Sequence, residues 1–133
     1  MDLIEWTNDL NLGIAFIDES HQKLVSLANE FIDGMRRGQP PCTLTLLLTQ
    51  LREHAIADIS AKESILSQTR YNRRSEQFMG NERLKVSIRK FHQHIKKTCS
   101  VSEIDVQNLK RTLVTHIHNS NQAITDCTAS LKI

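Results

Sequence analysis

The chain has 133 residues and a formal net charge of +2, from 17 Lys and Arg against 15 Asp and Glu. With 39% hydrophobic and 24% charged residues, four glycines and two prolines, it falls outside the disordered, collagen-like and low-complexity classes. The three cysteines, Cys42, Cys99 and Cys127, form no CxxC pair, which argues against a disulfide framework or a zinc ribbon. Few aromatic residues and few glycines favour an all-helical protein, and residues 1–133 are expected to form a single domain.

The first 17 residues are expected to form an arm that covers the helices following it. Its apolar residues are Trp6, Leu10, Leu12, Ile14 and Phe16. Two acidic residues among the first five argue against a secretory signal, which needs a basic start. No apolar run approaches the roughly 20 residues needed to span a bilayer. We therefore expect a cytoplasmic protein without a membrane partner.

Four segments with helical periodicity follow the arm, because apolar residues recur at spacings of three, four and seven. They cover about residues 18–37, 43–68 and 73–97, and the fourth runs from about residue 102 to at least residue 124. Gly38 and Pro40 end the first segment, and Asn72 is expected to cap the third. Ser102, with Asp105 three positions later, resembles a capping box at the start of the fourth.

The links between these segments are short, at about residues 38–42, 69–73 and 98–101. Short links between long helices make neighbours in the sequence antiparallel. The fold class predicted is all-α: an antiparallel up-down-up-down four-helix bundle with an N-terminal arm.

Each predicted helix also carries polar residues on its inward face. In an antiparallel bundle, the starts of the first and third helices share a level with the ends of the second and fourth. An unpaired buried polar group costs roughly 1–3 kcal/mol, so seven at one level indicate a real polar cluster. The seven residues are His21, Asp58, Lys62, Gln77, Asn81, His116 and Asn121.

Several motifs of the chain match those of a known family. Those of the first part are Trp6, Leu12, Gly13, Ile14, Ile17, Asp18, Glu19, His21, Leu24 and Asn29. They resemble the opening signature of the bacterial hemerythrins. Tyr71 stands where that family has Tyr-Pro, with Asn72 in the place of the proline. His116, with a polar residue five positions later, matches the last ligand pair of the family, so the resemblance covers nearly the whole chain.

The resemblance implies a four-helix bundle that binds O2 at a di-iron centre. In that family, five histidines and two bridging carboxylates hold the iron atoms. Two histidines are kept here, as His21 and His116. Asp58 stands at the position of the second histidine, and Lys62 at that of the bridging glutamate.

The other three ligand positions have also changed. Gln77 and Asn81 stand at the next two histidine positions, and Asn121 stands at the bridging aspartate. A di-iron centre needs anionic bridges and neutral imidazoles, whereas a protonated lysine brings its own charge and no lone pair. Lys62, four residues after Asp58, can form an ion pair along the helix. We therefore expect a hydrogen-bonded polar plug and no cofactor.

A different register leaves a metal site open. His54, one turn before Asp58, could serve as the second histidine, with Asp58 as the carboxylate. His21, His54, Asp58 and His116 would then suffice for a single Fe or Zn ion. They would not suffice for a full di-iron centre.

Charge is distributed unevenly along the sequence. Residues 1–69 carry 5 Lys and Arg against 10 Asp and Glu, whereas residues 70–97 carry 9 against 2. The third helix is therefore basic, and Arg74, Arg83, Arg89 and Lys90 are candidates for binding an acidic protein partner. Nucleic acid is disfavoured as a partner because no aromatic residues alternate with the basic ones to stack on bases.

Three functions are compatible with the sequence. The first is a non-enzymatic interaction or signalling module built on a hemerythrin-like bundle that has lost its di-iron centre. The alternative is an oxygen- or iron-binding protein of the same family with a mononuclear or non-standard di-iron site. The third is a small-molecule binder or weak enzyme that uses the polar layer as a pocket. No catalytic residue is predicted, since the chain has no helical HExxH, Gly-rich phosphate loop or Ser/His/Asp order.

Overall fold

A computed structural model describes the backbone of residues 2–67, 74–98 and 100–131, and the side chains of residues 2–66, 80–98 and 100–127. Four long helices, α1 (Ala15–Arg36), α2 (Pro41–Ser67), α3 (Arg74–Thr98) and α4 (Glu103–Leu131), follow a short 3-10 helix, η1 (Asn8–Leu10). No strand occurs in these described ranges. The all-α bundle predicted from the periodicity is therefore confirmed.

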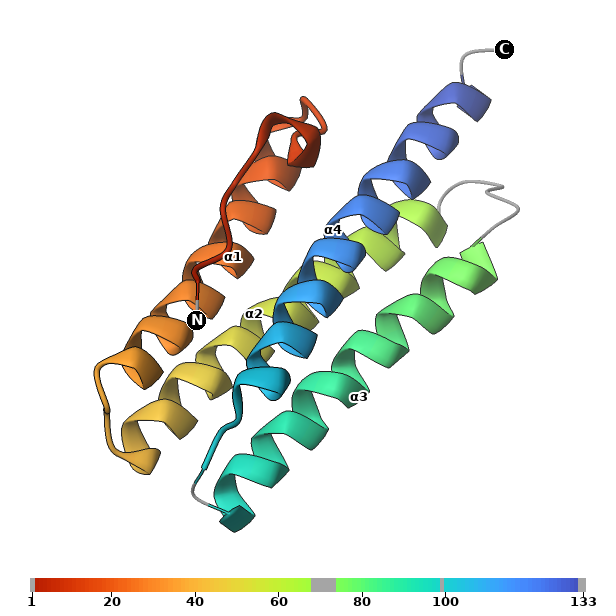
Figure 1. The fold of residues 1–133 in the computed structure, drawn as a ribbon. Helices are drawn as coiled ribbons and strands as arrows, with labels where there is room; N and C mark the ends of the chain where they lie inside the picture. Colours follow the sequence, from red (N-terminus) through yellow and green to blue (C-terminus); the bar gives the residue numbers. More distant parts are fainter. Residues whose placement is uncertain (1, 68–73, 99, 132–133) are drawn as a thin grey trace.

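The helices run antiparallel to their neighbours in the sequence (Figure 1). Helix α1 packs against α2 and α4, and α3 also packs against α2 and α4. As Figure 1 shows, α1 and α3 therefore lie on opposite sides of the bundle. None of the described helices is both long enough and apolar enough to cross a membrane.

Local sequence signals explain where the helices begin and end. At the end of α1, Gly38 has a φ of 70°, and the Gln39 amide donates to the Gly34 carbonyl at 2.9 Å. This is a Schellman ending, in which glycine adopts the left-handed conformation without strain. The predicted capping box at α4 is confirmed, since the Asp105 amide donates to Ser102 Oγ at 3.1 Å and the Ser102 amide donates to Asp105 Oδ2 at 3.2 Å. The cap expected at Asn72 lies outside the described residues.

The first helix starts three residues earlier than predicted, at Ala15 rather than about Asp18. The carboxylate of Asp18, in the first turn of α1, accepts hydrogen bonds from the backbone N–H groups of Leu12 and Gly13 at 2.8 and 2.9 Å. Asp18 therefore anchors the backbone turn that precedes the helix. The prediction that Phe16 covers the bundle is wrong, because its residue surface is 62% exposed. The extra helical turn points this side chain outward, away from the apolar face that begins at Ile17.

The arm is tied down by hydrogen bonds to α1 and α4. Asn29 of α1 makes two bonds with the backbone of Ile4, accepting its N–H at 2.7 Å and donating to its carbonyl at 3.0 Å. From α4, Lys110 donates to the Asp2 carbonyl at 2.8 Å, and Asn121 donates to the Leu10 carbonyl at 2.9 Å. The arm thus links the two helices that it crosses.

Two clusters of buried apolar residues fill the bundle. The larger, here called the main core, includes Leu24, Ala28, Phe31, Leu48, Leu51, Ala55, Ile59, Leu84, Ile88, Leu113 and Ile117. The smaller, here called the end core, consists of Ile17, Leu66, Ala123, Ile124 and Cys127. On α1, α2 and α4 the two clusters are separated by six or seven residues, about two helical turns. Buried polar side chains lie in or next to each of these stretches.

Candidate functional site

Four buried ionisable side chains lie where the main core meets the end core. His21 on α1, Asp58 and Lys62 on α2, and His116 on α4 are 0%, 5%, 3% and 6% exposed. We call these four residues the polar layer. Their meeting was predicted from the period of each helix and from the antiparallel arrangement. The structure brings all four together.

Asp58 is the centre of the layer because its carboxylate binds groups from three helices. Lys62 Nζ, one turn further along α2, donates to Asp58 Oδ2 at 2.6 Å. Ser20 Oγ of α1 donates to Asp58 Oδ1, also at 2.6 Å. His116 Nε2 of α4 lies 3.5 Å from Asp58 Oδ2. One carboxylate therefore fixes α1, α2 and α4 relative to one another.

Lys62 also contacts the other histidine of the layer, His21, through its Nε2 atom. A protonated lysine has only donors, so this nitrogen accepts and the His21 proton lies on Nδ1. That Nδ1 is buried and has no hydrogen-bond partner among the described residues. The rings of His21 and His116 stand edge to face with centroids 6.4 Å apart. The ammonium group thus lies between a carboxylate and an imidazole.

The protonation states of the layer follow from burial and from this arrangement. Burial, together with the nearby positive charge of Lys62, lowers the pKa of His21 from 6.5 to about 3. Burial also lowers the pKa of His116, against the opposing effect of its hydrogen bond to Asp58. Burial raises the pKa of Asp58, but hydrogen bonds from His116, Lys62 and Ser20 outweigh this and hold it well below its usual value. Near neutral pH the layer holds neutral histidines and an ionised carboxylate.

Lys62 carries the positive charge that this carboxylate needs. Burial lowers the pKa of Lys62, and the charge and hydrogen bond of Asp58 oppose that shift. An ion pair this deeply buried is sustained only when further hydrogen bonds satisfy its remaining atoms. Ser20 and His21 supply these, one to each member of the pair.

His54, the residue of the alternative register, lies beside the layer rather than within it. Its side chain is half-buried, and its Nε2 lies 3.0 Å from the Ser20 carbonyl oxygen and 3.4 Å from Ser20 Oγ. Ser20 therefore stands between His54 and Asp58. Neither Ser20 nor its bond to Asp58 was predicted. The only available signal was its position next to His21, on a helix turn that had to meet α2.

The three remaining predicted residues have different surroundings. Asn81 of α3 is buried and donates to Glu63 of α2 at 3.2 Å, so it is bonded to the neighbour of Lys62. Asn121 is half-buried and holds the arm through Leu10, while its Oδ1 has no partner among the described residues. The side chain of Gln77 lies outside the described residues. Glu63 was not predicted, because it sits one position off the apolar period of α2.

The donor set does not fit a di-iron centre. Lys62 Nζ is bonded to Asp58 Oδ2 and contacts His21 Nε2, two atoms that iron would need. The amide of Asn121, which the resemblance places at a bridging carboxylate, is bonded to the arm. Across the part of the chain that the structure describes, no three or more His, Cys, Asp and Glu side chains are grouped so as to hold a metal ion. The positive charge within this set of side chains is that of Lys62.

The basic residues predicted on the third helix are presented to the outside. Arg83, Arg89 and Lys90 are exposed, and none of them forms an ion pair with another described residue. By contrast, Lys85 is half-buried and pairs with Glu82 at 3.1 Å. The side chain of Arg74 lies outside the described residues. The described part of α3 therefore has a cationic outer face.

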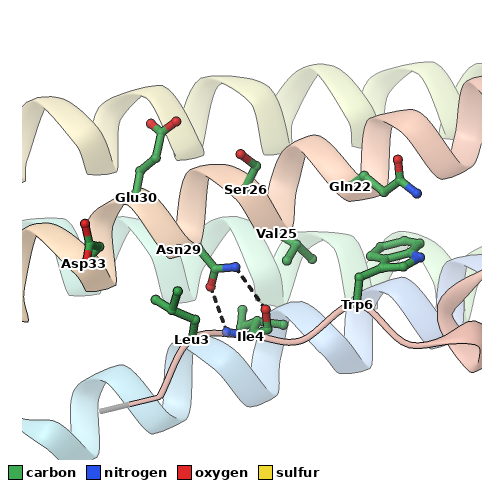
Figure 2. A pocket seen from close by; sticks show the side chains of 9 residues that line it. All are labelled: Leu3, Ile4, Trp6, Gln22, Val25, Ser26, Asn29, Glu30 and Asp33. Carbon is green, nitrogen blue, oxygen red and sulfur yellow. Dashed lines mark hydrogen bonds between the residues drawn. The ribbon is translucent and has the colours of Figure 1, made fainter.

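A hollow of about 590 Å³ lies between the arm and α1, away from the polar layer (Figure 2). Its lining is Leu3, Ile4, Trp6, Gln22, Val25, Ser26, Asn29, Glu30 and Asp33. Figure 2 shows that Asn29 reaches across to the backbone of Ile4 there. Because Asn29 is already bonded to the arm, this polar group is committed to holding the arm in place.

Comparison of the chain with protein-family models, curated proteins and solved structures gave no match in any of the three. What this chain does is therefore inferred from its own residues and their geometry.

Proposed function

We propose that this chain is a hemerythrin-like bundle that has lost the di-iron O2-binding centre and acts as a non-enzymatic interaction module. The observation that supports this most strongly is the position of Lys62. Lys62 is 3% exposed, and its ammonium is bonded to Asp58 and contacts His21 at the level where the resemblance places the iron ligands. A buried cation at this place supplies the positive charge that a carboxylate and two imidazoles would otherwise take from a metal.

The proposed binding surface is the outer face of α3. Arg83, Lys90 and Lys97 follow one another at seven-residue intervals and are all exposed. Such a spacing keeps side chains on one side of a helix, and 14 residues extend for about 21 Å. A partner matching this face carries acidic side chains along a strip of similar length. Electrostatic complementarity of this kind raises the rate of association and selects the partner.

The experiment compares how strongly two charge-reversed variants bind partner proteins. The first, R83E/R89E/K90E, alters the outer face of α3. The second, K23E/R36E/R111E, makes the same change in net charge at exposed residues of α1 and α4. Proteins cross-linked to the wild-type chain in extracts of its host are identified, and their acidic segments are synthesised as peptides for binding measurements.

The proposal predicts that such peptides bind the wild type and the control variant with similar affinity. It also predicts that they bind the α3 variant at least ten-fold more weakly, as expected when several surface charges are reversed. Equal binding to all three proteins would exclude α3 as the binding surface. The alternative function, with Fe or Zn held by His21, Asp58 and His116, requires uptake of about one metal ion per chain under anaerobic titration.

A further inference from the structure

Three cationic groups gather where α2 meets α3. Arg52 of α2 reaches His92 of α3, with Arg52 Nη1 3.5 Å from His92 Nδ1. Lys96 follows His92 by one turn and so lies on the same side of α3. Arg52 is half-buried, Lys96 is exposed and His92 is only 5% exposed. We call these three residues the α2–α3 cation cluster.

No described carboxylate neutralises this cluster. Within the described residues, neither Arg52 nor Lys96 forms an ion pair, whereas Lys62 pairs with Asp58 and Lys85 pairs with Glu82. Burial lowers the pKa of His92, and the charges that act on it, those of Lys96 and Arg52, are both positive and lower it further. The fold has thus concentrated positive charge around a buried imidazole without an anion.

His92 also has a nitrogen without a partner. An N–H of Arg52 can donate to His92 Nδ1 only if that atom carries a lone pair, which places the ring proton on Nε2. His92 Nε2 is buried and has no hydrogen-bond partner among the described residues. Two cations lacking a counter-charge and a donor lacking an acceptor are therefore found at one place. A single negatively charged group beside Arg52 and Lys96 would supply the counter-charge that both lack, and its charge would act on the His92 ring.

We propose that Arg52, His92 and Lys96 form an anion site that holds a carboxylate side chain of an acidic protein partner. The proposal rests on the function proposed above, because the site borders the basic outer face of α3. The planar guanidinium of Arg52 offers the paired donors that match a carboxylate. A protein is favoured over a nucleic acid because Phe91, the one Phe, Tyr or Trp among the described side chains of α3, packs against Phe31 in the core and is not available to stack on bases.

The experiment measures the titration of His92 by NMR at low ionic strength, with and without a peptide of eight glutamates. A carboxylate brought within about 4–6 Å of an imidazole raises its pKa. We expect the peptide to raise the pKa of His92 by about one pH unit, and a peptide of eight glutamines to leave it unchanged. The exposed His118 of α4, which lies 3.6 Å from Asp9, serves as the internal reference.

Two variants test whether the α2–α3 cation cluster causes this change in the pKa of His92. Arg52→Gln and Lys96→Gln each remove one positive charge next to His92, so each is expected to raise the pKa of His92 in the free protein. Each is also expected to weaken binding of the glutamate peptide about ten-fold. The matched control is Lys23→Gln, on the opposite side of the bundle, which should alter neither quantity.

The outcomes separate this proposal from the one on which it rests. If the peptide binds and R83E/R89E/K90E weakens it while R52Q and K96Q do not, the anion site is wrong and the α3 surface stands. If the peptide does not bind, or leaves the His92 titration unchanged, the anion site is also overturned. An oligonucleotide that raises the pKa of His92 when the glutamate peptide does not would reassign the site to phosphate.

Discussion

Leu24 and His21 lie one turn apart on α1, and both have a relative exposure of 0%. Leu24 belongs to the main core, where stability comes from apolar area removed from water. His21 belongs to the polar layer, whose side chains are held by hydrogen bonds to one another and to Ser20. Both regions are buried and are built from the same helices. Burial alone therefore does not say how a region is stabilised, and the two should respond differently to mutation.

The two regions also differ in how strictly they fix the positions of the helices along one another. Apolar contacts in the main core tolerate small shifts of one helix along another, because they have no direction. In the polar layer, Asp58 accepts from Ser20 on α1 and Lys62 on α2, with His116 of α4 within reach. Such bonds are lost if any of these helices slides by a fraction of a turn. We therefore expect the polar layer to set the register of a bundle whose cohesion comes from the main core.

The largest effect is expected from Asp58→Ala, which leaves the buried charge of Lys62 without its partner. Breaking one member of a buried ion pair costs about 3–5 kcal/mol. Leu51→Ala in the main core is the matched variant, with an expected loss of about 2–5 kcal/mol from cavity formation. Urea unfolding followed by circular dichroism gives both free energies. A loss below about 1 kcal/mol for Asp58→Ala would show that Lys62 is not held as a charged group.

Acid should destabilise the fold through the polar layer. The pKa of His21 is about 3 in the folded state, against an ordinary value of 6.5. Between these values the unfolded chain binds more protons, so stability falls as pH falls, by at most about 1.4 kcal/mol per pH unit for this histidine. Below the usual range of a carboxyl, the lowered pKa of Asp58 acts in the same direction.

This pH dependence is measured from urea midpoints at several pH values between 7 and 4. His21→Leu removes the titrating group and should make the slope shallower by about one proton. Gln93→Leu changes an exposed residue of α3 that does not titrate and serves as the control, with the wild-type slope expected. An unchanged slope in His21→Leu would mean that the acid sensitivity arises elsewhere.

A smaller effect is expected at the arm. Asn29→Ala removes two hydrogen bonds to the Ile4 backbone, each worth about 1 kcal/mol. Hydrogen exchange of the Ile4 amide should become faster, while amides of the main core such as that of Leu48 lose protection only through the fall in global stability. Exchange of Ile4 at the wild-type rate would show that the arm is held by its apolar contacts alone.

The smallest change in stability is expected when both charges are replaced together. In the double variant Asp58→Leu, Lys62→Met, no buried charge is left unpaired, and such replacements are often neutral or stabilising. We expect a free energy of unfolding within about 1 kcal/mol of the wild type, or higher. If the polar layer sets the helix register, amide NMR spectra of this variant should be broadened or doubled around His116. A sharp single spectrum would assign the register to the main core instead.

Sequence reasoning found the members of the polar layer because helical period decides which residues face inward. His21, Asp58, Lys62 and His116 each interrupt an apolar stripe, and an antiparallel bundle brings such interruptions to one level. It did not find Ser20 or Glu63, since both lie one position away from a stripe and join the network through side-chain length and rotamer. The spacing of the apolar residues alone does not show which side chains beside a stripe reach into the network.

Helical period also fails to predict where Phe16 and Asn121 lie. Phe16 is apolar, but the start of α1 is set by hydrogen bonds between the arm and Asp18, and the resulting helix turns Phe16 outward. Asn121 was expected to join the polar layer, but its amide donates to the Leu10 carbonyl of an arm whose path was not predictable from helical period. Irregular segments follow individual hydrogen bonds, whereas helices follow a pattern.

In the function proposed above, the ammonium of Lys62 takes the place of a metal ion. The most direct test is the free energy of unfolding measured under anaerobic conditions with a chelator, with ferrous iron and with zinc. A ligand that binds only the folded state, present at 100 times its Kd, would raise this free energy by about 2.7 kcal/mol. We predict the same value in all three solutions. An increase with either metal would contradict the account and make His21, Asp58 and His116 the ligands of a metal site.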